Sequence, residues 1–143
     1  MKRLVTVIAT TLGIAASAQA QEVPDLVTIL ASDEPQTQLM SMVLSAQALQ
    51  QGATVHILLC GPAGDLALIQ APASATAPQE PRGMSPQGLM QSVMQNGGTV
   101  EVCAIYLPNK GVGGEALLDG ISAADPAKMA ARLLAPNTRI MSN

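Results

Sequence analysis

The sequence predicts an α/β fold, a three-layer sandwich in which helices cover both faces of a mostly parallel sheet. Short β-rich runs alternate with helical segments along the chain, so successive strands need crossover connections, which make neighbouring strands parallel. The run at residues 54–59 (TVHILL) is nearly continuous in apolar residues rather than alternating. That pattern is typical of a strand that is covered on both faces.

Composition limits the functions that this chain can have. It contains 143 residues, of which 48% are hydrophobic, 12% charged and 1% aromatic, and its net charge is -3. The length suits one domain with a real core, and the apolar content excludes a disordered chain. The negative charge leaves no basic surface for a nucleic-acid partner. Because Phe and Trp are absent, the core must be built from aliphatic residues and methionine.

The first twenty residues predict a secretory signal peptide. Lys2 and Arg3 form a basic start, residues 4–16 are apolar, and Ala18 and Ala20 form a small-x-small cleavage site. The apolar run is too short to span a bilayer. We therefore expect an exported protein, periplasmic or secreted, that has no membrane partner after cleavage. Its mature part, residues 21–143, would be a single domain in a compartment where disulfides persist.

The mature chain opens with a strand, a long helix and a second strand. The β-rich run at 25–31 is stopped by residues 32–35, and Gly52 ends the helix that follows. Between residues 36 and 51, apolar residues recur at helical spacing and predict one buried stripe, made by Leu39, Met40, Val43 and Leu44. The second strand, at 54–59, ends at Cys60.

The central part of the chain predicts two helices separated by a loop. Pro62 opens a short helix within residues 61–70. Residues 71–83 are low in complexity and contain three prolines, so we expect a mobile loop there. Ser85 is a helix cap and Pro86 suits the first helical position, which predicts a helix to about residue 95.

The last part of the chain predicts three strands and one further helix. A third strand covers 99–104, with Cys103 as its penultimate residue, and a loop covers 106–114. The remaining elements are a helical turn at 115–118, a very short strand at 120–122, a helix opened by Asp125 and Pro126 and ending near residue 134, and a closing strand at 138–141.

Both cysteines are predicted at one edge of the sheet. Cys60 follows the second strand and Cys103 nearly ends the third, and the carboxyl ends of parallel strands are where such sheets bind ligands. Helix amino termini at that edge favour a thiolate, and Lys110 adds a nearby cation. Cys103 is therefore a candidate nucleophile. A buried cysteine that acts as a small hydrophobic residue fits the same pattern.

A disulfide is the main alternative for the two cysteines. If the second and third strands are neighbours, their ends lie ~5 Å apart, which is within the separation that a disulfide requires. A structural bond between Cys60 and Cys103 would stabilise the fold by roughly 3 to 4 kcal/mol. The same pair could instead cycle between oxidised and reduced forms.

A metal site is a third interpretation. His56 lies on the same side of its strand as Cys60, and the sulfur atoms of Met84, Met90 and Met94 would suit Cu(I). However, the spacing matches no recognised metal motif, and methionine is the natural filler of a core without Phe. We therefore predict no metal and no other cofactor.

Several stretches resemble the DsrE-like sulfur-relay family. The most specific is Cys103 at a strand end, with Lys110 and Gly111 seven and eight positions on. The position three residues after Cys103, which is a second cysteine in some relatives, is Tyr106 here. The other similar stretches are 26–30, 51–53, 55–59, 99–102, 117–118, 120–121 and 139–141.

The resemblance implies a five-stranded parallel sheet, assembly into homo-oligomers or hetero-oligomers of related subunits, and a cysteine that carries sulfur as a persulfide. That role falls on Cys103, with Lys110 and Tyr106 in support, and it requires sulfur donor and acceptor proteins as partners. The alternative function is a noncatalytic exported binding subunit, in which Cys60 and Cys103 form a structural or redox disulfide.

Overall fold

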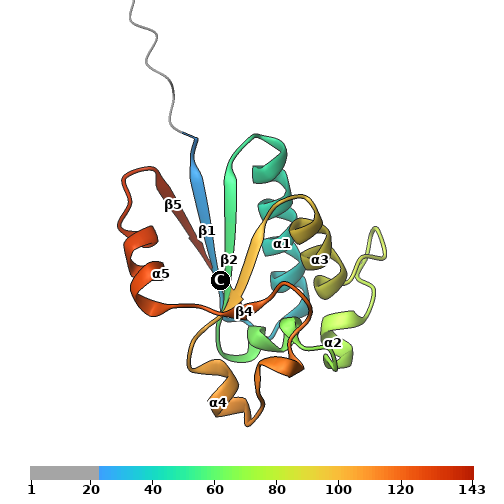
Figure 1. Ribbon diagram of the computed structural model, residues 1–143. Helices are drawn as coiled ribbons and strands as arrows, with labels where there is room; N and C mark the ends of the chain where they lie inside the picture. Colours follow the sequence, from blue (N-terminus) through green and yellow to red (C-terminus); the bar gives the residue numbers. More distant parts are fainter. Residues whose placement is uncertain (1–22) are drawn as a thin grey trace, which may run out of the picture.

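A computed structural model describes residues 23–143, so the predicted signal peptide, residues 1–20, lies outside the described part (Figure 1). The elements follow in the order β1 (Asp25–Leu30), α1 (Pro35–Gln50), β2 (Thr54–Leu59), the 3-10 helix η1 (Gly61–Ala67), α2 (Ala73–Thr76), α3 (Pro86–Gln95), β3 (Thr99–Val102), α4 (Tyr106–Lys110), the 3-10 helix η2 (Gly114–Ala116), β4 (Ser122–Ala123), α5 (Pro126–Leu133) and β5 (Thr138–Ser142).

These strands form one five-stranded sheet in the order β4-β3-β2-β1-β5, and every pair is parallel. The central strand β2 is paired along its length with β1, from Asp25 beside Thr54 to Leu30 beside Leu59. On its other side, His56 to Leu59 pair with Thr99 to Val102 of β3. The predicted α/β class with a parallel sheet is therefore confirmed, and β2 and β3 are neighbours.

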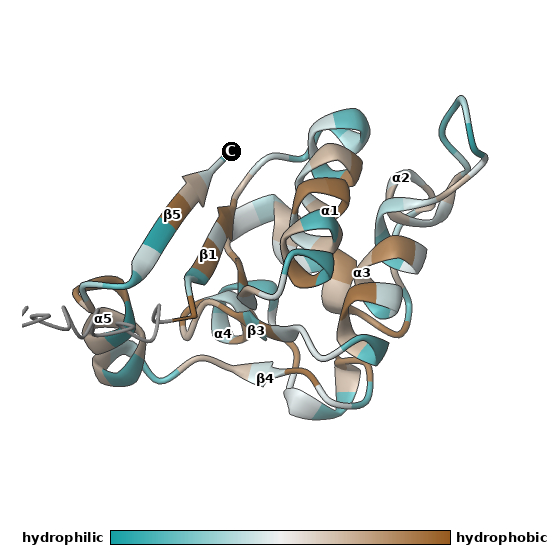
Figure 2. Cartoon of the chain, turned by 90° about the horizontal axis from the view of Figure 1, so that it is seen from above, coloured by the Kyte–Doolittle hydropathy of each residue, from teal (hydrophilic) through white to brown (hydrophobic). Residues whose placement is uncertain are grey.

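Helices lie on both faces of the sheet, as predicted. Figure 2 shows α1 and α3 on one side of the strands and α5 on the other. The larger core cluster lies under α1 and α3 and includes Leu30, Met42, Ile57, Leu59 and Met90, all fully buried. The cluster under α5 is smaller and consists of Val27, Leu58, Ala124 and Met129. Alternate side chains of β2 therefore enter two different cores.

The main helices begin at capping residues that each precede a proline. The Glu34 carboxylate accepts hydrogen bonds from the backbone N–H groups of Gln36 and Thr37, and these bonds lower the pKa of Glu34. Ser85 caps α3, and Asp125 caps α5 in the same way. Because such caps are local, the sequence locates the start of α3 and α5 correctly.

The predicted buried stripe of α1 is wrong in part. Met40 and Leu44 are 52% and 42% exposed, and Leu39 and Val43 are only partly buried. The buried residues are Gln38, Ser41, Met42 and Ser45. The polar residues among them are hydrogen-bonded: Ser45 to Thr28, Ser41 to the Thr37 carbonyl, and Gln38 to the Ser32 carbonyl. Hydrogen-bonded hydroxyls such as those of Ser41 and Ser45 can be buried at little cost, so periodicity alone does not orient this helix.

Two segments that were predicted as loops contain short helices. Residues 71–83 include α2, which buries Ala75, and the chain then projects as a loop closed by a bridge between Gln79 and Met84 (Figure 1). Residues 106–114 include α4, which ends at Gly111 in the left-handed conformation. Helices of one turn are too short to show a periodic pattern, so the sequence does not reveal them.

Candidate functional site

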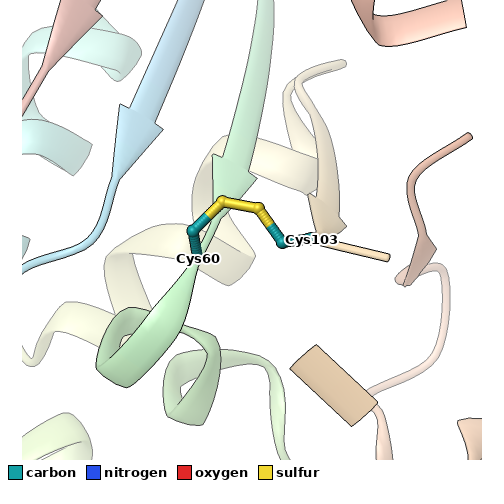
Figure 3. Close-up of a disulfide and its surroundings, with 2 residues drawn as sticks. All are labelled: Cys60 and Cys103. Carbon is teal, nitrogen blue, oxygen red and sulfur yellow. A yellow bond between two sulfur atoms is a disulfide. The ribbon is translucent and has the colours of Figure 1, made fainter. Parts of the chain in front are cut away.

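Cys60 and Cys103 are joined by a disulfide at the carboxyl edge of the sheet (Figure 3). Their Cα atoms are 5.0 Å apart, although the residues are 43 positions apart in the chain. Leu59 and Val102 are register partners on β2 and β3, so the residues that follow them lie side by side. β3 ends at Val102, earlier than predicted, and Cys103 therefore follows the strand rather than lying within it.

The backbone around the disulfide continues the hydrogen bonding of the sheet. The N–H of Cys60 donates to the Leu30 carbonyl at 2.9 Å, and the N–H of Cys103 donates to the Leu59 carbonyl at 2.8 Å. Both side chains are half-buried against the smaller core cluster. The two cysteines thus sit on a hydrogen-bonded backbone and are partly exposed as residues. In this oxidised form neither sulfur is a nucleophile, so thiol chemistry requires the bond to open.

Tyr106 and Lys110, the two predicted supporting residues, both contact Asp65. The Tyr106 hydroxyl donates to Oδ1 of Asp65 at 2.6 Å, and Nζ of Lys110 lies 2.6 Å from the same oxygen. Asp65 belongs to η1, which follows Cys60, whereas α4 follows Cys103. The carboxylate therefore ties together the two segments that leave the cysteines. The sequence analysis missed Asp65 because no local spacing links it to residues more than 40 positions away.

Replacing Asp65 should change the titration of Tyr106. Burial, followed by the hydrogen bond to Asp65, raises the pKa of Tyr106. We expect Asp65→Asn to lower this pKa but to leave it above its ordinary value, because burial remains. Tyr106 is the only tyrosine of the chain, so the ultraviolet absorbance of phenolate reports it directly. Asp119→Asn, a change of an exposed carboxylate, is the control, and an unchanged pKa in Asp65→Asn would contradict the prediction.

The direction of the Tyr106 shift also predicts a dependence of stability on pH. The phenol of the unfolded chain ionises near its ordinary pKa of about 10, whereas the folded state holds the proton to higher pH. The stability that this shift contributes is therefore complete below that pH and is lost as the pH rises above it. In Asp65→Asn the pKa shift of Tyr106 is smaller, so the stability lost at high pH through this group should also be smaller.

Gly64 fits the ring of Tyr106 closely. A Cβ atom at position 64 would overlap three ring carbons of Tyr106, and the ring is buried and held by Asp65. We expect Gly64→Ala to reduce the free energy of unfolding by about 1 to 3 kcal/mol, measured by urea denaturation. Gly114→Ala is the matched control, because a Cβ there has nothing within 4 Å. Equal stability of the two variants would mean that the ring is free to move aside.

Neither a membrane-spanning helix nor a metal cluster is found in residues 23–143. No helix of that range is both long and apolar enough to cross a bilayer. Nor does any group of three His, Cys, Asp or Glu side chains within it lie close enough together to hold a metal ion. Of the methionines considered as copper ligands, Met90 is fully buried and Met84 and Met94 pack against the core.

Comparison with solved structures identifies the fold. The ychN protein from E. coli superposes with a TM-score of 0.66 at 15% identity, over 85% of this chain and 99% of that one. MTH1491 from Methanobacterium thermoautotrophicum, of unknown function, gives 0.61 at 11% identity, over 84% of this chain and 99% of that one. BT1422 from Bacteroides thetaiotaomicron, also of unknown function, gives 0.57 at 18% identity, over 83% and 95%.

The chain shares the fold of these three proteins. At these identities the likeness concerns the fold alone, and no family model and no curated protein matches the sequence. In this chain the disulfide lies at the ends of two adjacent strands of the sheet, and the Asp65 contacts lie in the segments that follow them.

Proposed function

We propose that this protein is an exported sulfur carrier in which Cys103 holds sulfane sulfur as a persulfide. The observation that carries the proposal is the half-buried cysteine pair, fixed at disulfide distance on the edge of the sheet where α/β proteins bind ligands. The resemblance of the sequence around Cys103 and Lys110 to the DsrE-like sulfur-relay family supports the same function. A disulfide also agrees with an oxidising compartment, to which the predicted signal peptide would direct the chain.

Loading starts from the reduced protein, which an external dithiol produces by exchange with the disulfide. The Cys103 thiolate attacks the terminal sulfur of a donor persulfide, R–S–SH. The donor sulfur–sulfur bond breaks, the donor leaves as the thiolate R–S⁻, and Cys103 becomes Cys–S–SH. One sulfur atom is transferred with its proton, and the transfer needs no metal or cofactor.

Two nucleophiles can then remove the sulfur. The thiolate of an acceptor protein takes the terminal sulfur and regenerates the Cys103 thiolate. Alternatively, the Cys60 thiolate attacks Sγ of Cys103, forms the disulfide and expels hydrosulfide. Because the two Cα atoms are 5.0 Å apart, the second reaction needs little movement of the backbone. Cys60 is thus the proposed resolving residue, and the disulfide is the unloaded form of the site.

Exposed apolar side chains in the segments that leave this edge suit a protein partner. Ile105 is 71% exposed and lies two residues after Cys103, and Ile69 is 60% exposed just beyond η1. We propose that the sulfur donor or acceptor, or a second related subunit in an oligomer, contacts the protein at this edge. Such a contact would shield the persulfide from solvent during transfer.

Intact mass spectrometry tests the sulfur-carrier proposal. The protein is reduced, freed of reductant, mixed with a polysulfide and quenched in acid at increasing times. We expect an early species with the mass of one added sulfur atom, followed by the oxidised protein that is lighter than the reduced one by two hydrogen atoms. Absence of the sulfur adduct at every time, in both the wild type and Cys60→Ser, would overturn the proposal.

The second candidate function is a noncatalytic binding subunit with a structural disulfide. The observation that favours it is that, within the described residues, both cysteines are disulfide-bonded and no thiol is free. Alkylation of denatured, unreduced protein counts the thiols present in the isolated material. No free thiol, together with no sulfur uptake after reduction, would support this function instead of the carrier.

A further inference from the structure

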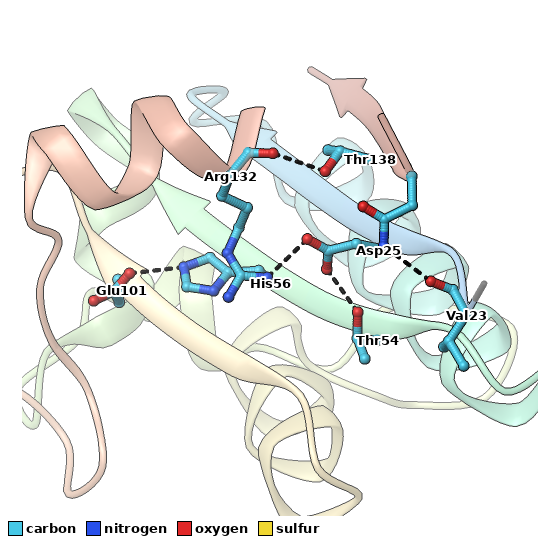
Figure 4. Close-up of polar contacts among 8 residues, drawn as sticks. Val23, Asp25, Thr54, His56, Glu101, Arg132 and Thr138 are labelled. Atoms are coloured by element: carbon cyan, nitrogen blue, oxygen red, sulfur yellow. Dashed lines mark hydrogen bonds and ion pairs between the residues drawn. The ribbon is translucent and has the colours of Figure 1, made fainter. Parts of the chain in front are cut away.

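A second polar site lies under α5 (Figure 4). It surrounds a cavity of about 450 Å³ that is lined by Asp25, His56, Glu101, Asp125, Lys128, Met129 and Arg132. His56 is four residues before Cys60 on the same side of β2, which separates their Cα atoms by ~13 Å. Glu101, in contrast, is two residues before Cys103, and Met129 packs in the same core cluster as both cysteines, so the cavity and the disulfide share one face of the sheet. The ligand proposed below contacts neither sulfur atom.

The carboxylates of the cavity are largely engaged by groups of the protein itself. Asp25 accepts a hydrogen bond from the Thr54 hydroxyl at 2.7 Å on one oxygen and lies 2.8 Å from the Arg132 guanidinium on the other. Asp125 caps α5 through one oxygen. Oε2 of Glu101 lies 2.7 Å from Nε2 of His56. Each carboxylate therefore has at least one oxygen engaged by the protein, and Asp25 has both.

The side chains of His56, Lys128 and Arg132 also have nitrogen atoms without a hydrogen-bond partner in the described residues. His56 is only 5% exposed, and its Nδ1 has no hydrogen-bond partner. Its Nε2 is close to Glu101 but without the alignment of a good hydrogen bond, and the contact becomes an ion pair only when the imidazole is protonated. Within residues 23–143 the Lys128 ammonium has no polar partner, and Arg132 uses one of its nitrogen atoms on Asp25. A buried imidazole nitrogen normally has a hydrogen-bond partner, so Nδ1 is available to a ligand or a water molecule.

We propose that this cavity binds a small oxyanion together with one proton. Lys128 and the free donors of Arg132 contact the anion, and His56 takes up the proton. Protonated imidazole donates from both nitrogens, which satisfies Glu101 through Nε2 and presents Nδ1–H to the anion. A neutral imidazole whose Nε2–H faces Glu101 would instead present a lone pair, which an anion repels.

The electrostatics around His56 determine the direction of the pH dependence. Burial, and then the positive charge of Arg132, lower the pKa of His56, whereas Glu101 and Asp25 oppose them. Lys128 and Asp125 also face the cavity. Without an anion, the His56 imidazole is therefore neutral near neutral pH. A bound anion raises the pKa of His56. Binding and protonation are coupled, so affinity rises as the pH falls, by about tenfold per pH unit between the free and bound pKa values.

Sulfate is the probe, because it has no titratable proton near neutral pH. His56 is the only histidine of the chain, so its NMR signals follow the imidazole without ambiguity. At constant ionic strength with chloride, we expect sulfate to raise the pKa of His56 and to bind about tenfold more tightly for each unit of pH decrease. No shift beyond that in chloride would overturn the proposal.

Two charge variants distinguish a specific sulfate site in this cavity from general attraction of sulfate to positive charge. Lys128→Gln removes a cation from the cavity, whereas Arg139→Gln removes one from an exposed position on β5. We expect Lys128→Gln to weaken sulfate binding about tenfold or more and Arg139→Gln to leave it unchanged. Equal effects of the two variants would overturn the proposal. His56→Gln should bind sulfate without the pH dependence, and a retained pH dependence would exclude His56 as the proton carrier.

Discussion

Replacing Cys103 with serine is expected to abolish sulfur uptake. In Cys103→Ser the hydroxyl is not ionised at neutral pH and cannot attack a donor persulfide, so the reduced variant should show no added sulfur after incubation with polysulfide. The variant keeps the Cys60 thiol, so its rate of uptake should fall far below that of the wild type, to the background measured for Cys60 alone. The backbone at position 103 is held by the Leu59 carbonyl, so serine should preserve the local geometry.

Cys60→Ser is the matched control for this prediction. It also breaks the disulfide, but it retains the thiol of Cys103. We expect it to take up one sulfur atom and to hold it longer than the wild type, because the resolving thiolate is absent. Uptake by Cys103→Ser at the wild-type rate would assign the sulfur to Cys60 and reverse the proposed roles. The comparison thus separates the loss of the disulfide from the loss of the nucleophile.

Removing the disulfide is expected to cause the largest change in stability. The bond closes a loop between residues 43 positions apart, and the cross-link restricts the unfolded chain. Cys60→Ala/Cys103→Ala should therefore lose roughly 3 to 4 kcal/mol of the free energy of unfolding relative to the oxidised wild type. The strand pairing and the Asp65 contacts do not depend on the sulfur atoms, so the double variant should keep its fold.

Urea denaturation of the oxidised protein, the reduced protein and the double variant measures this contribution. The reduced wild type should resemble the double variant, and added reductant should leave the double variant unchanged. A difference below about 1 kcal/mol between oxidised and reduced protein would show that the bond adds little to the fold. That result would remove the main physical reason for a purely structural disulfide.

Much of the fold could be predicted because its signals are local. The run at 54–59 indicates a doubly covered strand, and Ser85 and Asp125 mark helix starts through bonds to residues two or three positions on. The strand order was not available from such signals, yet it decides the site. Cys60 and Cys103 meet only because β2 and β3 are neighbours in register. The sequence left a free thiol, a structural bond and a redox pair open.

The orientation of α1 shows where periodicity fails. Met40 and Leu44 belong to the most apolar stripe, but the residues facing the sheet are Ser41, Met42 and Ser45. Thr28 offers Ser45 a hydrogen-bond partner within the sheet, and a satisfied polar pair can occupy a buried position. The pattern of one helix contains no information about the groups that its neighbours provide.

The sequence by itself determined the α/β class, the main helix starts and the position of both cysteines at strand ends, because each depends on residues close together in the chain. Tertiary structure alone decided that Asp65 joins Tyr106 to Lys110, and that Asp25 and Arg132 meet beside His56. Asp25 and Arg132 are 107 positions apart. Such contacts depend on strand order and register, which arise from the packing of the whole sheet rather than from any local pattern.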